Sequence, residues 1–270
     1  MHPILLEIGS FTLYSMWFMV ALGIITGGVT FIKLAKQYSL KLNFILDHSG
    51  TILLMGIVCA RALFVLKNLG YYFYQFGVEN FLSTLFIWDK GLSAWGAILG
   101  VALTIVYYAR KEEQAVLRWM DILFISLMAA MVLSNIGAFM EGAINYGKET
   151  ALPWGVKLEG PTIKYSIPIH PTQLYAALYT LILFLVSLYV FIKKTLPKDG
   201  DIFLFGGLAF AVIKFFEEFL RGDDVITLLW LREGQTFSLV AAITFGLSLL
   251  VRYNKLKLPK LPKLPKIKLK

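Results

Sequence analysis

Residues 119–140 read WMDILFISLMAAMVLSNIGAFM, a stretch in which Asp121 is the only charged residue. A helix needs about 20 mostly apolar residues to cross the hydrocarbon core of a bilayer. Six more stretches of this kind lie at 11–32, 44–66, 91–109, 170–192, 202–220 and 235–253. The sequence therefore predicts an all-α polytopic membrane protein with about seven transmembrane helices, formed by residues 1–253.

The composition agrees with this class. Of the 270 residues, 58% are hydrophobic and 16% are charged, and the mean hydropathy is +0.70. Soluble domains are about 45–50% apolar and about 25% charged, which argues against a soluble enzyme. One cysteine and three scattered histidines argue against a metal centre, and we expect no metal and no cofactor. The net charge of +9 then indicates a membrane partner and no nucleic acid.

The distribution of Lys and Arg predicts the orientation. The loops after the first, third and fifth stretches and the C-terminal tail hold seventeen of these residues, whereas the loops on the opposite side hold seven. Basic residues accumulate on the cytoplasmic side of membrane proteins. We therefore expect the N-terminus outside and the C-terminus in the cytoplasm.

Three segments lie outside the predicted helices. Residues 67–90 are rich in aromatic residues, which suits an interfacial segment at headgroup level. Residues 141–169 are polar with Gly and Pro, and we expect an extracytoplasmic cap. Residues 254–270 repeat Lys, Leu and Pro, which predicts a disordered basic tail that is attracted to the anionic inner leaflet. The alternative for this tail is a purely topogenic role with no specific partner.

Charged residues inside the apolar stretches are the first candidates for function. Lys214, Glu217, Glu218 and Arg221 are spaced three and four residues apart, so a helix places them on one face. Arg61 lies within the second stretch. One interpretation is a self-neutralised ladder near the outer membrane surface. The other is a cationic site for a lipid phosphate, with Arg61 and Arg221 as clamps.

Two further segments combine polar residues with helix ends. Asn135 and Glu141 lie near the end of 119–140 among small residues, and both need partners there. The residues His170, Pro171, Thr172, Gln173, Leu174 and Tyr175 open the fifth stretch, with Thr172 as a possible helix cap. His170 at a membrane boundary is a base, a hydrogen-bond anchor or a surface group. The pairs Gly23/Gly27 and Gly96/Gly100 have the spacing of close helix packing.

Four stretches together resemble the bacterial phosphatidylglycerol–prolipoprotein diacylglyceryl transferase family. Residues 2–15 are similar to its N-terminal pattern, and GLSAWGAILG at 91–100 is similar to its G-M-S-F-H-G-G-x-x-G segment. HPTQLY at 170–175 nearly repeats the family's H-P-[ST]-Q-L-Y. EFLRGDD at 218–224 followed by GQTFS at 234–238 is similar to E-F-F-R-x-P-D and G-Q-x-x-S. The resemblance covers the chain except for the tail.

The resemblance implies transfer of diacylglyceryl from phosphatidylglycerol to the cysteine thiol of a prolipoprotein, with release of glycerol phosphate and without a metal. It implies a multi-pass protein of the bacterial plasma (inner) membrane, with the prolipoprotein signal peptide as a partner. The reaction needs a base for the thiol and cations at the leaving phosphate. We assign His170 or Glu141 as the base. We assign substrate binding to Arg61, Asn135, Gln173, Tyr175, Lys214, Glu218 and Arg221.

The departures from the family pattern fall at the catalytic positions. Trp95 stands where the family has His, and indole cannot accept a proton. Lys214 replaces an Arg. Asn135, Ala138 and Ala143 stand where the family has Arg, Asn and Glu, and Met16 and Trp17 replace Tyr and Gly. The alternative hypothesis is therefore a catalytically inactive or repurposed paralogue that binds phospholipid or precursor lipoprotein without transfer.

Overall fold

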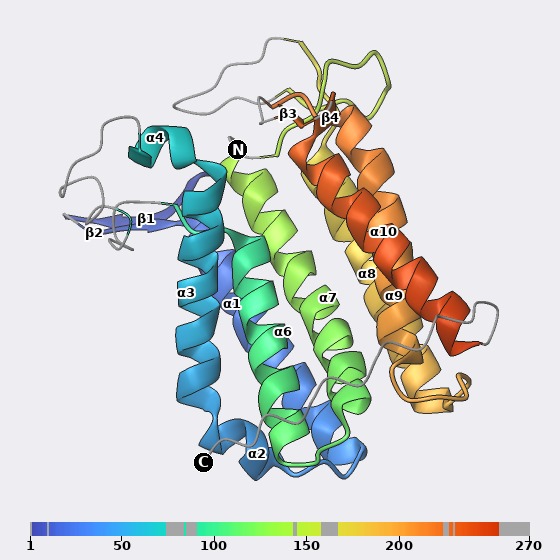
Figure 1. Ribbon diagram of the computed structural model, residues 1–270. Helices are drawn as coiled ribbons and strands as arrows, with labels where there is room; N and C mark the ends of the chain where they lie inside the picture. Colours follow the sequence, from blue (N-terminus) through green and yellow to red (C-terminus); the bar gives the residue numbers. More distant parts are fainter. Residues whose placement is uncertain are drawn as a thin grey trace.

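The computed structural model describes residues 2–9, 11–73, 84, 91–142, 145–157, 167–223, 227–228 and 230–253 (Figure 1). The predicted tail at 254–270 lies outside the described residues. So do most of the aromatic segment 67–90 and residues 143–144 and 158–166 of the predicted cap.

In the described part of the chain, one long helix lies in each of the seven predicted stretches. These helices are α1 (Ser15–Gln37), α3 (Ser49–Lys67), α6 (Ala94–Lys111), α7 (Val116–Glu141), α8 (Thr172–Lys193), α9 (Asp201–Glu217) and α10 (Glu233–Arg252). Five of them, α1, α3, α7, α8 and α10, are long and apolar enough to cross a membrane. Of the other two, α9 has 17 residues and α6 ends in Arg110 and Lys111. The helical, multi-pass class is thus supported by five candidate spans.

Three predicted boundaries are wrong, each for a local reason. Residues 11–14 begin no helix, because Phe11–Tyr14 forms strand β2, paired antiparallel with β1 (Ile4–Ile8) around Gly9 at φ +58°. The stretch 44–66 is broken at His48 into α2 (Leu42–Asp47) and α3. The stretch 202–220 tightens into a 3₁₀ turn, η1 (Glu218–Leu220), before Arg221 becomes extended at ψ 138°.

The described chain is also not purely helical. Besides the β1–β2 hairpin, a second antiparallel pair joins β3 (Thr227–Leu228) to β4 (Leu231–Arg232) just before α10. A short helix, α4 (Leu69–Phe73), follows α3. Figure 1 places both hairpins and α4 at the end of the bundle where α3, α7 and α9 finish and α6, α8 and α10 begin. We call this end the hairpin end.

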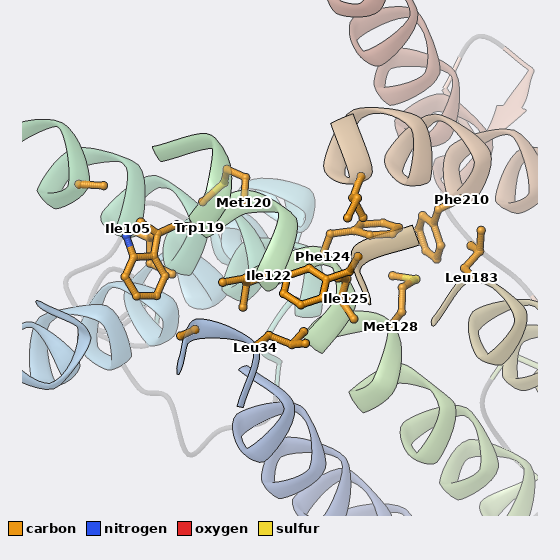
Figure 2. Packing of buried hydrophobic residues seen from close by; sticks show 14 of the residues in the cluster. Leu34, Ile105, Trp119, Met120, Ile122, Phe124, Ile125, Met128, Leu183 and Phe210 are labelled. Atoms are coloured by element: carbon orange, nitrogen blue, oxygen red, sulfur yellow. The ribbon is translucent and has the colours of Figure 1, made fainter. Parts of the chain in front are cut away.

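Helix α7 is the centre of the bundle. It lies between α1, α3 and α6 on one side and α8, α9 and α10 on the other (Figure 1). A helix that is apolar all round is stable only when it is buried, and Trp119, Ile122 and Ile125 of α7 are fully enclosed (Figure 2). The Trp119 ring stacks on Phe31 of α1 at 5.6 Å between centroids.

Glycine pairs permit close contacts between α3 and α6 and between α1 and α7. A Cβ on Gly96 or Gly100 of α6 would lie within 3.0 Å of backbone oxygens of α3. A Cβ on Gly23 or Gly27 of α1 would lie within 3.0 Å of backbone oxygens of α7. Only glycine permits these backbone approaches, so the packing role predicted for both pairs is confirmed.

Candidate active site

A network of six charged side chains occupies the hairpin end. Its members are Lys214 and Glu217 of α9, Glu218 of η1, Arg221 and Asp223 of the extended segment that follows, and Arg232 of β4. The predicted pairs form between Lys214 and Glu217 at 2.9 Å and between Lys214 and Glu218 at 3.1 Å. We call this set the ion-pair network.

Glu218 is the hub of the ion-pair network. Only 1% of its surface is exposed. One carboxylate oxygen accepts from Arg221 Nη1 at 2.8 Å and the other from Arg232 Nε at 3.2 Å. A buried carboxylate is stable when it is paired and hydrogen-bonded in this way. Glu218 therefore ties three segments together.

Arg221 connects the network to the cap. It binds Asp223 through Nε and Nη2, and Nη2 also donates to Asn145 Oδ1 at 2.8 Å. Burial opposes the charge of the guanidinium, but the carboxylates of Asp223 and Glu218 outweigh it and hold the pKa of Arg221 above its usual range. Arg221 is therefore a fixed cation.

The network differs from a ladder on a single helix face. Glu217 and Arg221 do not pair; Glu217 instead accepts a hydrogen bond from the Tyr179 hydroxyl of α8 at 2.9 Å. The three cations and three carboxylates balance to zero formal charge. A phosphate that binds to these cations must therefore displace a carboxylate from them. Asp223 is the most exposed of the three acids and is the easiest to displace.

Gly234 and Gln235 support this arrangement. A Cβ on Gly234 would lie within 3.0 Å of the Glu218 carboxyl group. The buried Gln235 side chain accepts from the Arg232 backbone N–H at 3.0 Å and so caps α10. The glycine and glutamine that the sequence singled out therefore hold Glu218 and Arg232 in place.

The cap joins two motifs that are far apart in the sequence. Gly147 bridges to Arg221, and a Cβ on Gly147 would lie within 3.0 Å of His170 atoms. Lys148 donates its N–H to Leu220 O at 2.8 Å and its carbonyl accepts from His170 N–H at 2.9 Å. The structure thus brings the segment of His170 against the segment of Arg221.

His170 is half-buried and lies beside an aromatic pair. Its Nδ1 is 3.2 Å from the Tyr175 hydroxyl, which also accepts from Trp154 Nε1 at 2.8 Å. No group among the described residues bonds to His170 Nε2. In the tautomer that carries its proton on Nδ1, that nitrogen can accept a substrate proton. The helix-cap role of Thr172 is wrong: Thr172 is the first residue of α8, and its hydroxyl donates to Asn145 O.

The other predicted site residues lie around this centre. Glu141 ends α7 before Gly142 and has no ion-pair partner in the described part of the chain. Asn135, one to two turns earlier, buries its amide Nδ2 without a hydrogen bond among the described residues. Such a donor costs about 1–3 kcal/mol unless a ligand or water satisfies it. Gln173 is almost fully buried in the first turn of α8.

Arg61 has its own surroundings on α3. Its Nε donates to Thr84 O at 2.9 Å and Nη1 to Gly91 O at 3.0 Å, between the rings of Phe64 and Tyr72. The end of α3 is fastened to the start of α10 by the ion pair of Lys67 with Glu233. These contacts hold the Arg61 side chain at the end of α3, and its role as a second phosphate clamp stays a prediction.

Trp95 fills the position where the resemblance has His. Its ring contacts Phe210 of α9 edge-on at 6.2 Å, and Phe210 in turn contacts Tyr179 at 5.9 Å. Tyr179 then reaches Glu217. An aromatic chain therefore connects Trp95 to the ion-pair network.

An apolar groove of about 320 Å³ lies between α8 and α9 beside the network. It is lined by Tyr175, Tyr179, Val212, Ile213, Phe216, Glu217 and Leu220. Phe216 is 63% exposed on the outer side of α9. The groove therefore leads from the outer surface of the bundle to the Tyr179–Glu217 pair and to Tyr175, which contacts His170.

Sequence reasoning missed Arg232, Asn145 and Tyr179. Arg232 reaches Glu218 through the β3–β4 hairpin, and Asn145 reaches Arg221 through the cap. Neither contact has a fixed sequence spacing. Tyr179 lies four residues after Tyr175, on the same helix face, and that spacing was the available signal.

A helical bundle with several candidate spans, a neutral network of buried charges and a half-buried histidine at one end defines a polytopic membrane protein with a polar site. A family model described as prolipoprotein diacylglyceryl transferase matches residues 3–252. The chain belongs to this family.

Curated relatives named phosphatidylglycerol–prolipoprotein diacylglyceryl transferase align over most of their length. The protein of Finegoldia magna is 31% identical over 242 residues, which are 89% of this chain and 92% of that protein. The protein of Clostridium tetani is 27% identical over 247 residues, 90% of this chain and 94% of that protein. The protein of Coxiella burnetii is 30% identical over 221 residues, 77% and 80% of the two chains.

Proposed function

We propose that the chain transfers diacylglyceryl from phosphatidylglycerol to the cysteine thiol of a prolipoprotein. Family membership over residues 3–252 and the names of the relatives support this activity over the inactive paralogue. The observation that carries it is the cap contact at Gly147, which joins the segments of His170 and Arg221. A candidate base and a candidate phosphate ligand thus belong to one site.

The proposed topology has seven spans, with α6 and α9 crossing beside the five longer or more apolar helices. The hairpin end then faces outside, and the basic loops and the tail lie at the anionic inner leaflet of the bacterial plasma membrane. The Lys and Arg distribution supports this orientation. It places the site where the cysteine of a translocated prolipoprotein signal peptide emerges.

The reaction transfers one proton, forms one carbon–sulfur bond and breaks one carbon–oxygen bond. His170 Nε2 takes the proton of the cysteine thiol, because the thiolate is the nucleophile. The sulfur forms a bond to the diacylglyceryl carbon, and the bond from that carbon to the phosphate oxygen breaks. Glycerol phosphate leaves with the electron pair and receives the proton. Glu141 is the second candidate for the base.

The ion-pair network stabilises the leaving phosphate. Asp223 separates from Arg221, and Lys214 and Arg221 then donate to phosphate oxygens. Buried Glu218 keeps both cations oriented. The unsatisfied Asn135 amide and the side chains of Gln173 and Tyr175 contact the lipid headgroup or the peptide. Arg61 of α3 also contributes to substrate binding.

The groove between α8 and α9 receives lipid chains. Its apolar walls suit an acyl chain, and its inner end meets Glu217 and Tyr175. A phospholipid seated there enters sideways from the bilayer, with its phosphate toward the network.

Complementation tests the proposal. The chain is expressed in bacteria depleted of their own diacylglyceryl transferase, and lipoprotein maturation is followed by gel shift. We expect rescue by the native chain and by His48→Ala, a histidine at the opposite end of the bundle, and loss of rescue with His170→Ala. If the native chain is expressed in the membrane and fails to rescue maturation, the result would favour the hypothesis of an inactive paralogue.

A further inference from the structure

A second cavity lies at the opposite end of the bundle from the ion-pair network. It measures about 520 Å³ and is formed by the ends of α1 and α8 and the starts of α7 and α9. Helix α8 separates the two sites by about 30 Å at 1.5 Å per residue. The reaction proposed above makes no use of this cavity.

The cavity wall carries hydrogen-bond donors with unused capacity. Arg118 donates from Nε to Asp199 Oδ2 at 2.7 Å, and neither of its Nη groups bonds to a described residue. The Tyr38 hydroxyl and Lys194 Nζ likewise have no hydrogen-bond partner among the described residues. Lys194 is held at the mouth by its left-handed backbone, φ +49°. These groups form a set of donors suited to an anion.

The acidic groups of the cavity are already satisfied. Asp121 is 1% exposed, and its two carboxylate oxygens accept from the N–H groups of Gly200 at 2.6 Å and Phe203 at 2.8 Å. Asp199 is paired with Arg118. With Lys198 and Lys194 the lining has three cations and two carboxylates, which leaves a net positive charge.

Tyr38 remains a proton donor throughout the physiological range. Burial raises the pKa of its phenol, and the carboxylates of Asp121 and Asp199 raise it further. Its ring lies edge-on to Phe191 at 4.5 Å between centroids, and both residues line the cavity.

The remainder of the wall is mostly apolar. It consists of Val190, Phe191, Leu196, Pro197 and Ile202, with the polar residues Gln37 and Ser39 beside Tyr38. An inorganic ion gains no binding free energy from apolar surface, whereas the glycerol and the first methylenes of a phospholipid gain it by burial.

We propose that this cavity is a second phosphate site, which binds the phosphate monoester or diester of a glycerophosphate compound at the end of the bundle remote from the active site. Arg118 Nη and the Tyr38 hydroxyl donate to the phosphate oxygens, and Lys194 and Lys198 supply charge at the mouth. The ligand is either a phospholipid headgroup of the adjacent leaflet or a free glycerol phosphate.

Hydrogen exchange of the full-length protein in detergent micelles tests the site locally, at residues 194–203. The probes are dihexanoyl-phosphatidylglycerol, glycerol 1-phosphate and, as the phosphate-free control, dihexanoylglycerol. A ligand at ten times its Kd slows exchange that requires opening of the bound form by about tenfold. The cavity variants separate this effect from binding at the active site, because they change only residues that line the cavity.

The variants decide between a site and diffuse charge. Tyr38→Phe combined with Lys194→Gln removes two donors and keeps the aromatic packing, and we expect the slowing to disappear. Lys193→Gln removes the same charge from the exposed neighbour that does not line the cavity, and we expect the slowing to remain.

Each outcome is decisive. Slowing by both phosphate probes supports the site with a free phosphate ester as a sufficient ligand, and slowing by the lipid alone supports a headgroup. No slowing by either probe overturns the proposal. So does equal slowing by dihexanoylglycerol, or equal loss of the effect in Lys193→Gln.

Discussion

Arg232 Nε donates to Glu218 Oε2 across 3.2 Å, although the two residues are 14 positions apart. The contact closes the ion-pair network from the side of α10. Arg232 Nη2 also donates to the carbonyl and carboxylate oxygens of Asp223, at 2.9 and 2.8 Å. One side chain thus holds the 3₁₀ turn, the extended segment and the start of α10 in register.

Arg232→Gln is expected to destabilise the protein. Breaking a buried pair costs about 3–5 kcal/mol when the remaining charge is left alone, and Lys214 and Arg221 still face Glu218, so we expect the lower part of that range. The measurement is thermal unfolding in detergent. Arg232→Lys keeps the charge and should lose less, whereas equal loss in both variants would contradict the electrostatic explanation.

Gly234→Ala is expected to disturb Glu218 directly. The added Cβ lies within 3.0 Å of the carboxyl group, so the carboxyl or α10 must move. Transfer activity should fall by about 100-fold if the network loses its geometry. Gly246→Ala is the matched control on the same helix, because its Cβ meets open space; it should leave activity unchanged and stabilise α10 by about 0.5–1 kcal/mol.

The helices could be predicted from the sequence because burial in lipid requires long apolar stretches. The glycine pairs were equally accessible, since close packing needs small residues at fixed spacing. The end of α9 was not: KFFEEFLR at 214–221 continues the helical pattern, and only the contacts of Glu218 with Arg221 and with distant Arg232 explain the turn there. Residues 11–14 were predicted as part of a helix because FTLY is as apolar as the first turn of a membrane helix, but they form strand β2.

The site was predictable where its contacts are local. Pairs three or four residues apart, such as Lys214 with Glu218, follow from helix geometry. The meeting of His170 with the Arg221 segment depends on Gly147 of the cap, and no periodic pattern encodes a backbone crossing of that kind. Resemblance to the family indicated that both motifs matter, but their proximity came only from the structure.

Tyr175→Phe separates the positioning of His170 from its proton transfer. The hydroxyl lies 3.2 Å from His170 Nδ1 and accepts from Trp154. Its removal should lower kcat by about tenfold and shift the pH profile, whereas His170→Ala should lower kcat by about 100-fold to 10⁴-fold. The assay is transfer from phosphatidylglycerol to a lipobox peptide. An unaltered pH profile in Tyr175→Phe would argue against a role through His170.

Trp95→Phe tests whether the side chain at the position where the family has His contacts the reacting groups. Phenylalanine keeps the contact with Phe210 and removes the indole N–H. If the base is His170, activity should stay within about threefold of the native value, with a small loss of stability of about 1 kcal/mol from the reduced volume. A loss as large as that of His170→Ala would instead place Trp95 in direct contact with the reacting groups.

Val212→Trp should obstruct the groove between α8 and α9. The larger ring occupies much of the 320 Å³ beside Tyr179 and Glu217. We expect a KM for phosphatidylglycerol that rises by about tenfold, equivalent to about 1.4 kcal/mol of lost binding, with kcat nearly unchanged. The control is Phe205→Trp, an exposed position of α9 outside the groove. Equal effects in both variants would argue against entry through the groove, because Val212 lines the groove and Phe205 does not.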